Sequence, residues 1–183
     1  MEQNKPRIMK NSTTLLEFAA LNYSLTSNQK EALNDIAEFL SSDKFCFVLK
    51  GYAGTGKTFL LGVINAYFKT IKRDLVFAAP TGRAAKVINN SIKAPAYTIH
   101  KTIYSKNNFK EFKIKNLDGS ETFKYSFQLK NNEDQANTVY LIDEASMISD
   151  VYNEMEFFRF GSGHLLRDLF NYVNMDNNDH RKK

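Results

Sequence analysis

The sequence has little of what would support disulfide bonds or a membrane span. Its single cysteine, Cys46, lies in the apolar run 45–49, where we expect a buried, reduced thiol. No stretch approaches the ~20 apolar residues that a membrane-spanning helix needs, and the N-terminus MEQNKPRIMKNSTT contains no apolar signal core. Internal repeats and low-complexity segments are also missing. These absences exclude a disulfide scaffold and a membrane protein, and they predict a cytoplasmic location with no membrane partner.

What the 183 residues do contain is typical of a soluble, folded domain. Hydrophobic residues make up 43% and charged residues 25%, values that favour neither disorder nor a membrane protein. This length supports one compact domain with a modest appendage, large enough to bury a core. The formal net charge of +5 is mild and is compatible with a polyanionic partner such as nucleic acid.

Apolar patterning predicts helices that alternate with strands. Thr26 is the expected N-cap of a helix whose apolar face runs from Ala32 to Leu40 and which ends at Ser41-Ser42-Asp43. Uninterrupted apolar strands separated by helices are typical of an α/β fold in which helices cover both faces of a parallel sheet. The other expected helices are 14–22, 57–69, 81–89 and 98–104, and the expected strands are 45–49, 75–79 and 139–142.

A β-hairpin is predicted as an insertion within residues 106–130. This segment has no helical period, and Asp118-Gly119 at its centre is a two-residue turn signal. With that turn, Lys113 faces Lys124 on one side of the hairpin, and aromatic and aliphatic residues face each other on the other side. The expected register therefore separates an aromatic face from a basic face.

The segment GYAGTGKT follows the first apolar run and opens a helix, which is the order that a phosphate-binding loop requires. It fits the pattern G-x-x-x-x-G-K-[ST], in which backbone N–H groups surround the β- and γ-phosphates. Lys57 adds a positive charge there, the Thr58 hydroxyl can ligate Mg²⁺, and the helix N-terminus favours an anion. The expected nucleotide-binding residues are Gly51, Ala53, Gly54, Thr55, Gly56, Lys57 and Thr58.

A second chemical motif is LIDEASM, residues 141–147, in which an apolar strand ends in two carboxylates. Asp143 can hold Mg²⁺ directly or through water, and Glu144 can orient and deprotonate an attacking water. Taken alone, an ordinary acidic loop after a strand explains this motif equally well. Paired with the phosphate loop, it predicts Lys57, Asp143 and Glu144 as catalytic residues and Thr58 and Asp143 as the metal site.

Four motifs in order resemble the N-terminal motifs of superfamily 1 DNA helicases of the RecD-like and Dda-like kind. They are GYAGTGKT, AAPTGRAAK at 78–86, TIHKTI at 98–103 and LIDEASM, and the resemblance covers roughly residues 25–147. It implies a RecA-like P-loop NTPase domain over 25–183, preceded by an N-terminal extension with a short helix over 1–24. It also implies hydrolysis of ATP with Mg²⁺ and movement along single-stranded DNA, usually from 5′ to 3′.

The resemblance also assigns Gln29, in LTSNQKEAL, the role of the family's adenine-reading glutamine. The same side chain fits a capping box, because Thr26-x-x-Gln29 satisfies the start of a helix without any nucleotide. Both interpretations of Gln29 stay open at the level of sequence.

The family's DNA-contacting motifs match Thr81 and Arg83, and then Thr98 and His100. The local alternatives are that Thr81 is only a helix N-cap and that His100 is a partly buried residue at a helix start. The hairpin stands where these helicases insert a small β subdomain that serves as a pin against which the duplex splits. That role is an analogy, and a plain surface hairpin stabilised by its aromatic face fits equally well.

The sequence departs from the family after Glu144. The family continues with a strand ending in Gly-Asp-x-x-Gln and a second motor domain that carries catalytic arginines, and this sequence has no Gly-Asp pair and no Gln after Asp143. Because an arginine finger contributes about 10³ to 10⁵ in rate in other nucleotide hydrolases, we expect nucleotide binding to exceed hydrolysis. The missing strand predicts a loosened core at 139–142, or a strand borrowed from 175–183, from another chain or from a missing C-terminal motor domain.

Three functions therefore compete. The leading hypothesis is the ATP-binding N-terminal portion of an ATP-dependent DNA helicase, which binds Mg-ATP and single-stranded DNA and lacks helicase activity alone. The alternative is a non-catalytic, nucleotide-dependent module that binds DNA or protein. A small P-loop kinase is a third candidate, but it leaves the TGRAA and TIH motifs unexplained.

Overall fold

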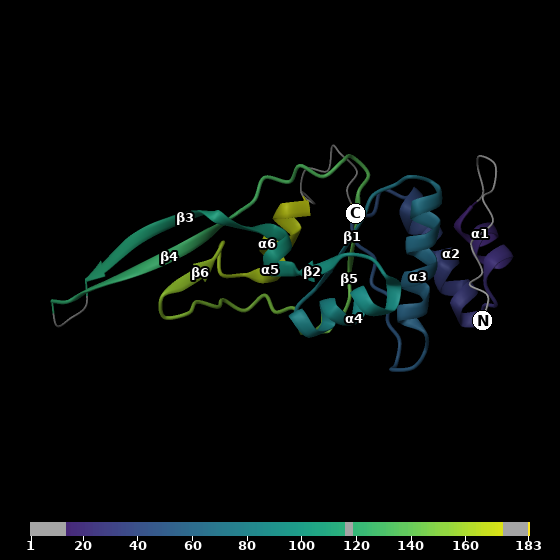
Figure 1. Ribbon diagram of the computed structural model, residues 1–183, viewed down its shortest axis with the longest axis horizontal. Coiled ribbons are helices and arrows are strands. Elements are labelled where there is room, and N and C mark those ends of the chain that lie inside the picture. Colours follow the sequence, from purple (N-terminus) through teal and green to yellow (C-terminus); the bar gives the residue numbers. More distant parts are fainter. Residues whose placement is uncertain (1–13, 116–118, 174–182) are drawn as a thin grey trace.

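The computed structural model describes residues 14–115, 119–173 and 183, and it consists of an α/β region from which a long β-hairpin projects (Figure 1). Within these residues, no helix is both long and apolar enough to cross a membrane. The elements in chain order are α1 (Leu15–Asn22), α2 (Ser27–Ser41), α3 (Lys57–Thr70), β1 (Leu75–Ala79), α4 (Gly82–Ile92), β2 (Ala96–Thr98), α5 (Ile99–Ile103), β3 (Tyr104–Lys115), β4 (Glu121–Leu129), β5 (Val139–Ile142), the short 3₁₀ helix η1 (Ala145–Met147), β6 (Phe158–Phe160) and α6 (Leu165–Val173).

The central sheet is parallel, with strand order β2-β1-β5. Successive side chains of β1 point to opposite faces: Phe77 and Ala79 pack with residues of α3 and α4, whereas Ala78 packs with residues of α5 and α6. Helices therefore cover both faces of this sheet. The predicted mixed α/β fold of the P-loop kind is confirmed.

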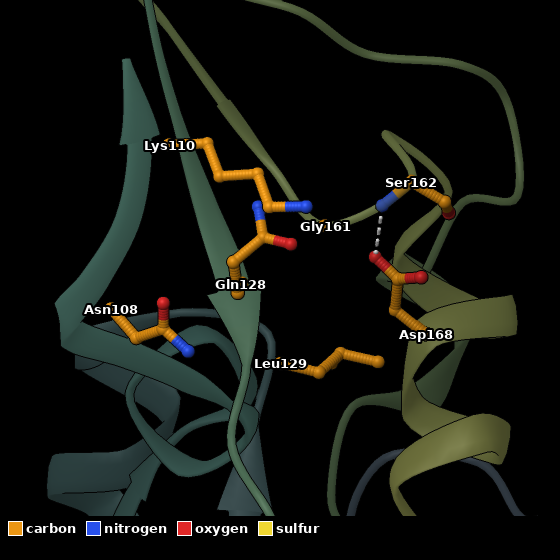
Figure 2. A pocket seen from close by; sticks show the side chains of 7 residues that line it. All are labelled: Asn108, Lys110, Gln128, Leu129, Gly161, Ser162 and Asp168. Carbon is orange, nitrogen blue, oxygen red and sulfur yellow. Dashed lines mark hydrogen bonds between the residues drawn. The ribbon is translucent and has the colours of Figure 1, made fainter.

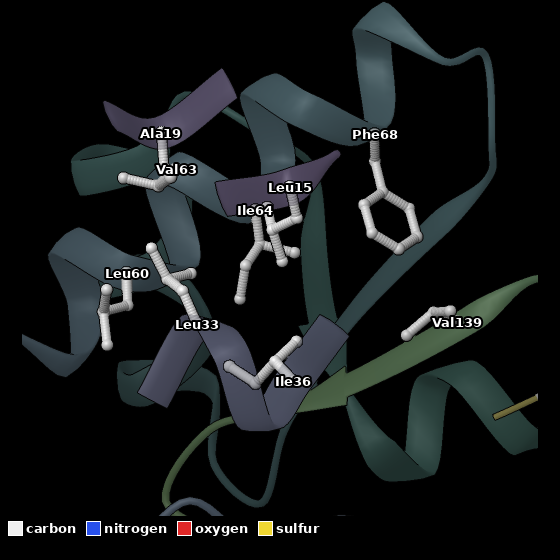
Figure 3. Packing of buried hydrophobic residues seen from close by; sticks show 9 residues of the cluster. All are labelled: Leu15, Ala19, Leu33, Ile36, Leu60, Val63, Ile64, Phe68 and Val139. Carbon is white, nitrogen blue, oxygen red and sulfur yellow. The ribbon is translucent and has the colours of Figure 1, made fainter. Parts of the chain in front are cut away.

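One core cluster joins the N-terminal helices to the sheet. Figure 3 shows side chains from α1, α2 and α3 converging with Val139 of β5. This packing places α1 directly against α3, the helix that follows the phosphate loop. The buried members are Leu15, Ala19, Leu33, Ile36, Leu60, Val63, Ile64, Phe68 and Val139.

Threonine caps begin the helices where the sequence predicted them. Thr14 and Thr26 form complete capping boxes, in which the third helical residue returns a side-chain bond to the cap backbone. Thr81 accepts from the Ala84 N–H, and Thr98 accepts from the Lys101 N–H. Because these bonds are local, they could be read from sequence.

The expected strand at 45–49 is wrong. The segment has no strand hydrogen bonding, Phe45 and Val48 are 46% and 66% exposed, and only Leu49 packs against the core cluster. Cys46 is also exposed, so the expectation of a buried thiol fails with it. The physical reason is non-local: an apolar, β-prone segment becomes a strand only when a neighbour accepts its backbone hydrogen bonds.

The free edge of β5 has a single backbone bridge among the described residues. Lys183 N donates to Thr138 O at 3.0 Å, and Tyr140 N donates to Lys183 O at 2.5 Å, which is the pattern of a parallel pair. Val139 between them is buried, and the loosened core expected at 139–142 stays a prediction. The Lys183 ammonium donates to the Phe39 carbonyl at 2.9 Å and to the Ser42 carbonyl. The borrowed strand expected from 175–183 otherwise lies outside the described residues.

The hairpin forms as predicted, but its register is shifted by one residue. Lys113 lies opposite Phe123 and Phe112 opposite Lys124, so lysines and aromatic residues share each face. The predicted separation into an aromatic and a basic face is therefore wrong. The expected register would have placed Lys113 against Lys124, a destabilising pair of like charges, whereas Lys113 now lies 3.0 Å from the carboxylate of Glu121. The predicted turn residue Asp118 lies outside the described residues.

Two elements at the hairpin base were not predicted. The short strand β6 pairs in parallel with β4, and together they complete an outer sheet of order β3-β4-β6. Helix α6 packs in the same apolar cluster as Ala78 of the central sheet, and the buried hydrogen bond from the Tyr104 hydroxyl to Asp168 Oδ2, 2.7 Å long, links it to β3 of the outer sheet. Burial and this bond both raise the pKa of Tyr104, so the hydroxyl remains a donor at neutral pH.

Candidate nucleotide site and nucleic-acid interface

The phosphate loop is a tight turn with its lysine folded across it. The Lys57 ammonium donates to the carbonyls of Gly51 and Tyr52 at 2.6 and 2.9 Å. The Thr55 hydroxyl donates to the same Tyr52 carbonyl at 2.8 Å. Carbonyls are modest partners for an ammonium compared with a charged phosphate. The positive charge of Lys57 is therefore held above the loop by groups that an anion can replace.

Gly56 is required at the start of α3 for two separate reasons. Its φ of +89° lies in the left-handed region that side chains rarely adopt. A Cβ at this position would also lie 2.5 Å from Nε2 of Gln29. As the N-cap of α3, it brings no side chain to cap the first-turn N–H groups, and such groups are a binding site for anions.

Gln29 fulfils the capping role and also faces the phosphate loop. Its Oε1 accepts from the Thr26 N–H at 3.0 Å, and its backbone N–H donates to Thr26 Oγ1 at 3.3 Å. Its Nε2 lies close to Gly56, so the side chain of Gln29 on α2 packs beside the start of α3. The capping box of Gln29 is therefore present, and the side chain stands beside the loop that would bind phosphate.

Asp143 and Glu144 stand at the carboxyl end of β5. The Asp143 N–H donates to the Ala78 carbonyl at 3.1 Å, which extends the pairing between β5 and β1 by one residue. Asp143 Oδ1 accepts from the Glu144 N–H at 2.9 Å, and Glu144 has a left-handed φ of +54°. Asp143 is half-buried and Glu144 is exposed, so the turn separates a fixed carboxylate from a solvent-facing one.

The expected Mg²⁺ site at Thr58 and Asp143 is not a preformed protein cage. Among the described residues, no group of three or more His, Cys, Asp and Glu side chains is gathered so that it could hold a metal ion. Mg²⁺ usually takes only one or two protein ligands together with nucleotide phosphates. A hydroxyl at the start of α3 and a carboxylate at the end of β5 fit that incomplete donor set.

Three of the expected DNA-contacting residues share one edge of the central sheet. Ala79 pairs with Thr98 in the parallel register, so the carboxyl ends of β1 and β2 lie side by side. Thr81 and Thr98 therefore cap neighbouring helices at this edge. Arg83 is exposed in the first turn of α4. Thr81 acts as a helix N-cap, as the alternative interpretation of this residue predicted, because its hydroxyl caps α4.

His100, the fourth expected DNA contact, turns inward. Its ring is half-buried and packs against two aromatic rings, with centroid distances of 5.6 Å to Tyr104 and 4.9 Å to Phe160. Burial lowers the pKa of His100, which favours the neutral ring at physiological pH. This arrangement matches the alternative of a partly buried residue at a helix start, and it places the imidazole within an aromatic cluster.

The segment 75–110, which includes this edge, carries a concentration of positive charge. Residues 75–110 contain six basic and no acidic residues, leaving 19 basic and 20 acidic residues in the rest of the chain. The whole positive excess of the protein therefore comes from this segment. The signal was available as a local charge count, which the net charge of +5 averaged away. All six basic side chains are exposed: Arg83, Lys86, Lys93, Lys101, Lys106 and Lys110.

A polar hollow of about 560 Å³ lies at the hairpin base (Figure 2). Lys110 and Gln128 line one side, and Ser162 and Asp168 line the other. Asp168 Oδ2 already accepts from the Tyr104 hydroxyl and from the Ser162 N–H. Its carboxylate therefore ties the hairpin to α6.

Comparison with known proteins identifies the family. A family described as AAA domain matches residues 24–155. The uncharacterized protein R530 of Acanthamoeba polyphaga mimivirus is 31% identical over an aligned length of 134 residues, and the match covers 67% of this chain and 27% of that protein. The ATP-dependent DNA helicase dda of Enterobacteria phage T4 is 36% identical over 77 residues, which are 42% of this chain and 18% of that protein.

The matched region contains both chemical motifs, because it includes the phosphate loop and Asp143-Glu144. The chain spans about a quarter of the length of the mimivirus protein and less than a fifth of the phage helicase. No solved structure gave a significant match. Since the matched region covers well over half of the chain, the protein belongs to the AAA domain family, as a helicase-like P-loop nucleotide-binding domain.

Proposed function

We propose that this chain is the ATP-binding part of an ATP-dependent DNA helicase, and that it binds Mg-ATP at the phosphate loop and single-stranded DNA at the carboxyl ends of β1 and β2. The observation that carries the nucleotide site is the Lys57 ammonium held across the loop by two carbonyls. Lys57 is the first residue of the 14-residue helix α3, and the N-cap residue Gly56 has no side chain to bond the first N–H groups of that helix. The β- and γ-phosphates would replace the carbonyls as its partners and accept from the loop N–H groups.

The remaining roles follow from position. Thr58 and Asp143 would hold Mg²⁺, Glu144 would orient the attacking water, and Gln29 would contact adenine while it caps α2. Mg²⁺ would supply neutralisation of the developing phosphate charge. These roles extend beyond the family assignment, and each is tested by substituting the residue concerned.

DNA binding is supported by the charge distribution. The exposed residues Arg83, Lys86 and Lys101 lie on α4 and α5, the two helices that begin at this sheet edge, and the segment that contains them has no carboxylate. With two to four phosphate contacts, the slope of log affinity against log salt should be roughly −1.5 to −3. Binding that ignores salt, or a clear preference for duplex, would contradict this assignment.

The alternative is a module that binds nucleotide without turnover. It is favoured by the segment 45–49, which precedes the phosphate loop without forming a strand. A loop that is not anchored in the sheet holds the catalytic groups less firmly, and catalysis depends on that positioning. The two functions differ in the ATP turnover expected at saturating single-stranded DNA.

Thermal unfolding with and without Mg-ATP tests the nucleotide site. A ligand present at a hundredfold excess over Kd stabilises the fold by about 2.7 kcal/mol, which corresponds to a Tm increase of about 5 to 11 °C for a chain of this size. Lys57→Ala should remove most of this increase. Lys69→Ala is the matched control, because it removes an exposed lysine ~18 Å away along the same helix. An unchanged increase in Lys57→Ala would mean that the loop is not the site.

A further inference from the structure

We propose that Tyr97 is a stacking platform for one base of single-stranded DNA, and that Lys101 beside it contacts the adjoining phosphate. This role rests on the proposed function, because it specifies which residues at the carboxyl ends of β1 and β2 bind the nucleic acid. Tyr97 was not among the expected DNA contacts, and His100, which was, faces the aromatic cluster instead.

Tyr97 is exposed where its neighbours are buried. It lies opposite Ala78 in the register between β1 and β2, one residue from the carboxyl end of β2. Ala96 is 3% exposed and Ile99 is fully buried, whereas Tyr97 is 47% exposed. The ring therefore contributes less to the core than its neighbours do, and it stands beside the end of the strand where Thr98 caps α5.

Lys101 is held over the Tyr97 ring. Its ammonium lies 3.8 Å from the ring centroid, which is a close cation–π contact. The Lys101 N–H donates to Thr98 Oγ1 at 3.1 Å, and its carbonyl accepts from the Lys130 ammonium at 2.6 Å. The backbone that presents the pair is therefore fixed from both sides, so that less conformational entropy is lost on binding.

The charge around the pair favours a nucleic acid over a protein partner. Residues 75–110 carry six exposed basic side chains and no carboxylate, so a polyanion meets no repulsion from this segment. A basic groove that follows the backbone, combined with aromatic rings on which bases stack, is the common way of binding single strands. Duplex DNA keeps its bases stacked inside, and it would use only the lysine and arginine contacts.

Fluorescence anisotropy with a labelled oligothymidylate of about 12 nucleotides tests the platform. That length lies within the range of site sizes for a single-strand-binding fold. Tyr97→Ala in the full 183-residue chain should weaken binding at least about fivefold, the lower limit for loss of one base stack. Tyr97→Phe keeps the ring and should bind within about twofold of wild type. Leu21→Ala, which shortens an exposed apolar side chain on α1, is the control for a general surface effect.

An oligonucleotide of the same length with abasic sites separates stacking from phosphate binding. It keeps every phosphate but offers no base, so wild type and Tyr97→Ala should bind it equally. Lys101→Ala should reduce the salt slope by about 1 on either oligonucleotide, and Tyr97→Ala should leave the slope unchanged.

The outcomes distinguish the two levels of the proposal. Absence of oligothymidylate binding by the wild-type chain would overturn the proposed DNA-binding function and the platform with it. Normal binding by wild type together with equal binding by Tyr97→Ala would overturn the platform alone. An equal loss on the abasic strand would also overturn it, because the ring would then act by supporting the fold.

Discussion

Gly56→Ala perturbs the junction between the phosphate loop and Gln29, and its cost can be worked out from the structure. An L-residue held in the left-handed region costs about 1–2 kcal/mol, and the φ of Gly56 is +89°. The new Cβ would lie 2.5 Å from Gln29 Nε2. The amide must therefore move, which puts at risk its 3.0 Å bond to the Thr26 N–H. Loss of a capping interaction costs about 1 kcal/mol, so the expected total is about 2–3 kcal/mol.

Gly54→Ala is the matched control for this prediction. Gly54 has a similar φ of +79°, but a Cβ there meets nothing within 4 Å. It should show the backbone cost alone, about 1–2 kcal/mol. Chemical denaturation of both variants, each repeated with Gln29→Ala, forms a double-mutant cycle. The extra cost of Gly56→Ala should disappear when Gln29 is shortened. If Gly56→Ala proves no more destabilising than Gly54→Ala, the contact between Gln29 and the loop does not exist.

Two further predictions concern the hairpin base and the motor. Tyr104→Phe removes the hydroxyl that donates to the buried Asp168 carboxylate. It should lower the free energy of unfolding, measured by denaturant titration, by about 1–3 kcal/mol. An unchanged unfolding midpoint would mean that this hydrogen bond contributes nothing to stability. The 183-residue chain alone should bind Mg-ATP yet fail to unwind a tailed duplex, because no residue after Glu144 matches the family's Gly-Asp-x-x-Gln motif. Robust unwinding measured beside ATP turnover would refute this expectation.

Local signals account for the parts of the fold that could be predicted. Thr14, Thr26, Thr81 and Thr98 each cap a helix through bonds to residues three positions away. The apolar runs that were predicted as strands form β1 and β5, which pair with each other. The phosphate loop with its helix, and the carboxylates after β5, could also be located from sequence alone, because each is defined by a short run of neighbouring residues.

The predictions that were wrong concern features that depend on residues distant in the sequence. The run 45–49 has the composition of a strand, but the backbone neighbour that it needs is not encoded in those residues. The hairpin register follows from a connection longer than two residues, because Lys115 pairs with Glu121. The inward turn of His100 depends on Phe160, sixty positions later in the chain and part of the unpredicted strand β6.

Calorimetric titration of the full chain with ATP in the presence of Mg²⁺ tests the central claim most directly. The account predicts one ATP bound per chain, with binding lost in Lys57→Ala and retained in Lys69→Ala, because Lys57 lies across the phosphate loop and Lys69 lies in the last turn of α3. Failure of the wild-type chain to bind ATP, or equal binding by Lys57→Ala, would contradict the assignment of this loop as the nucleotide site.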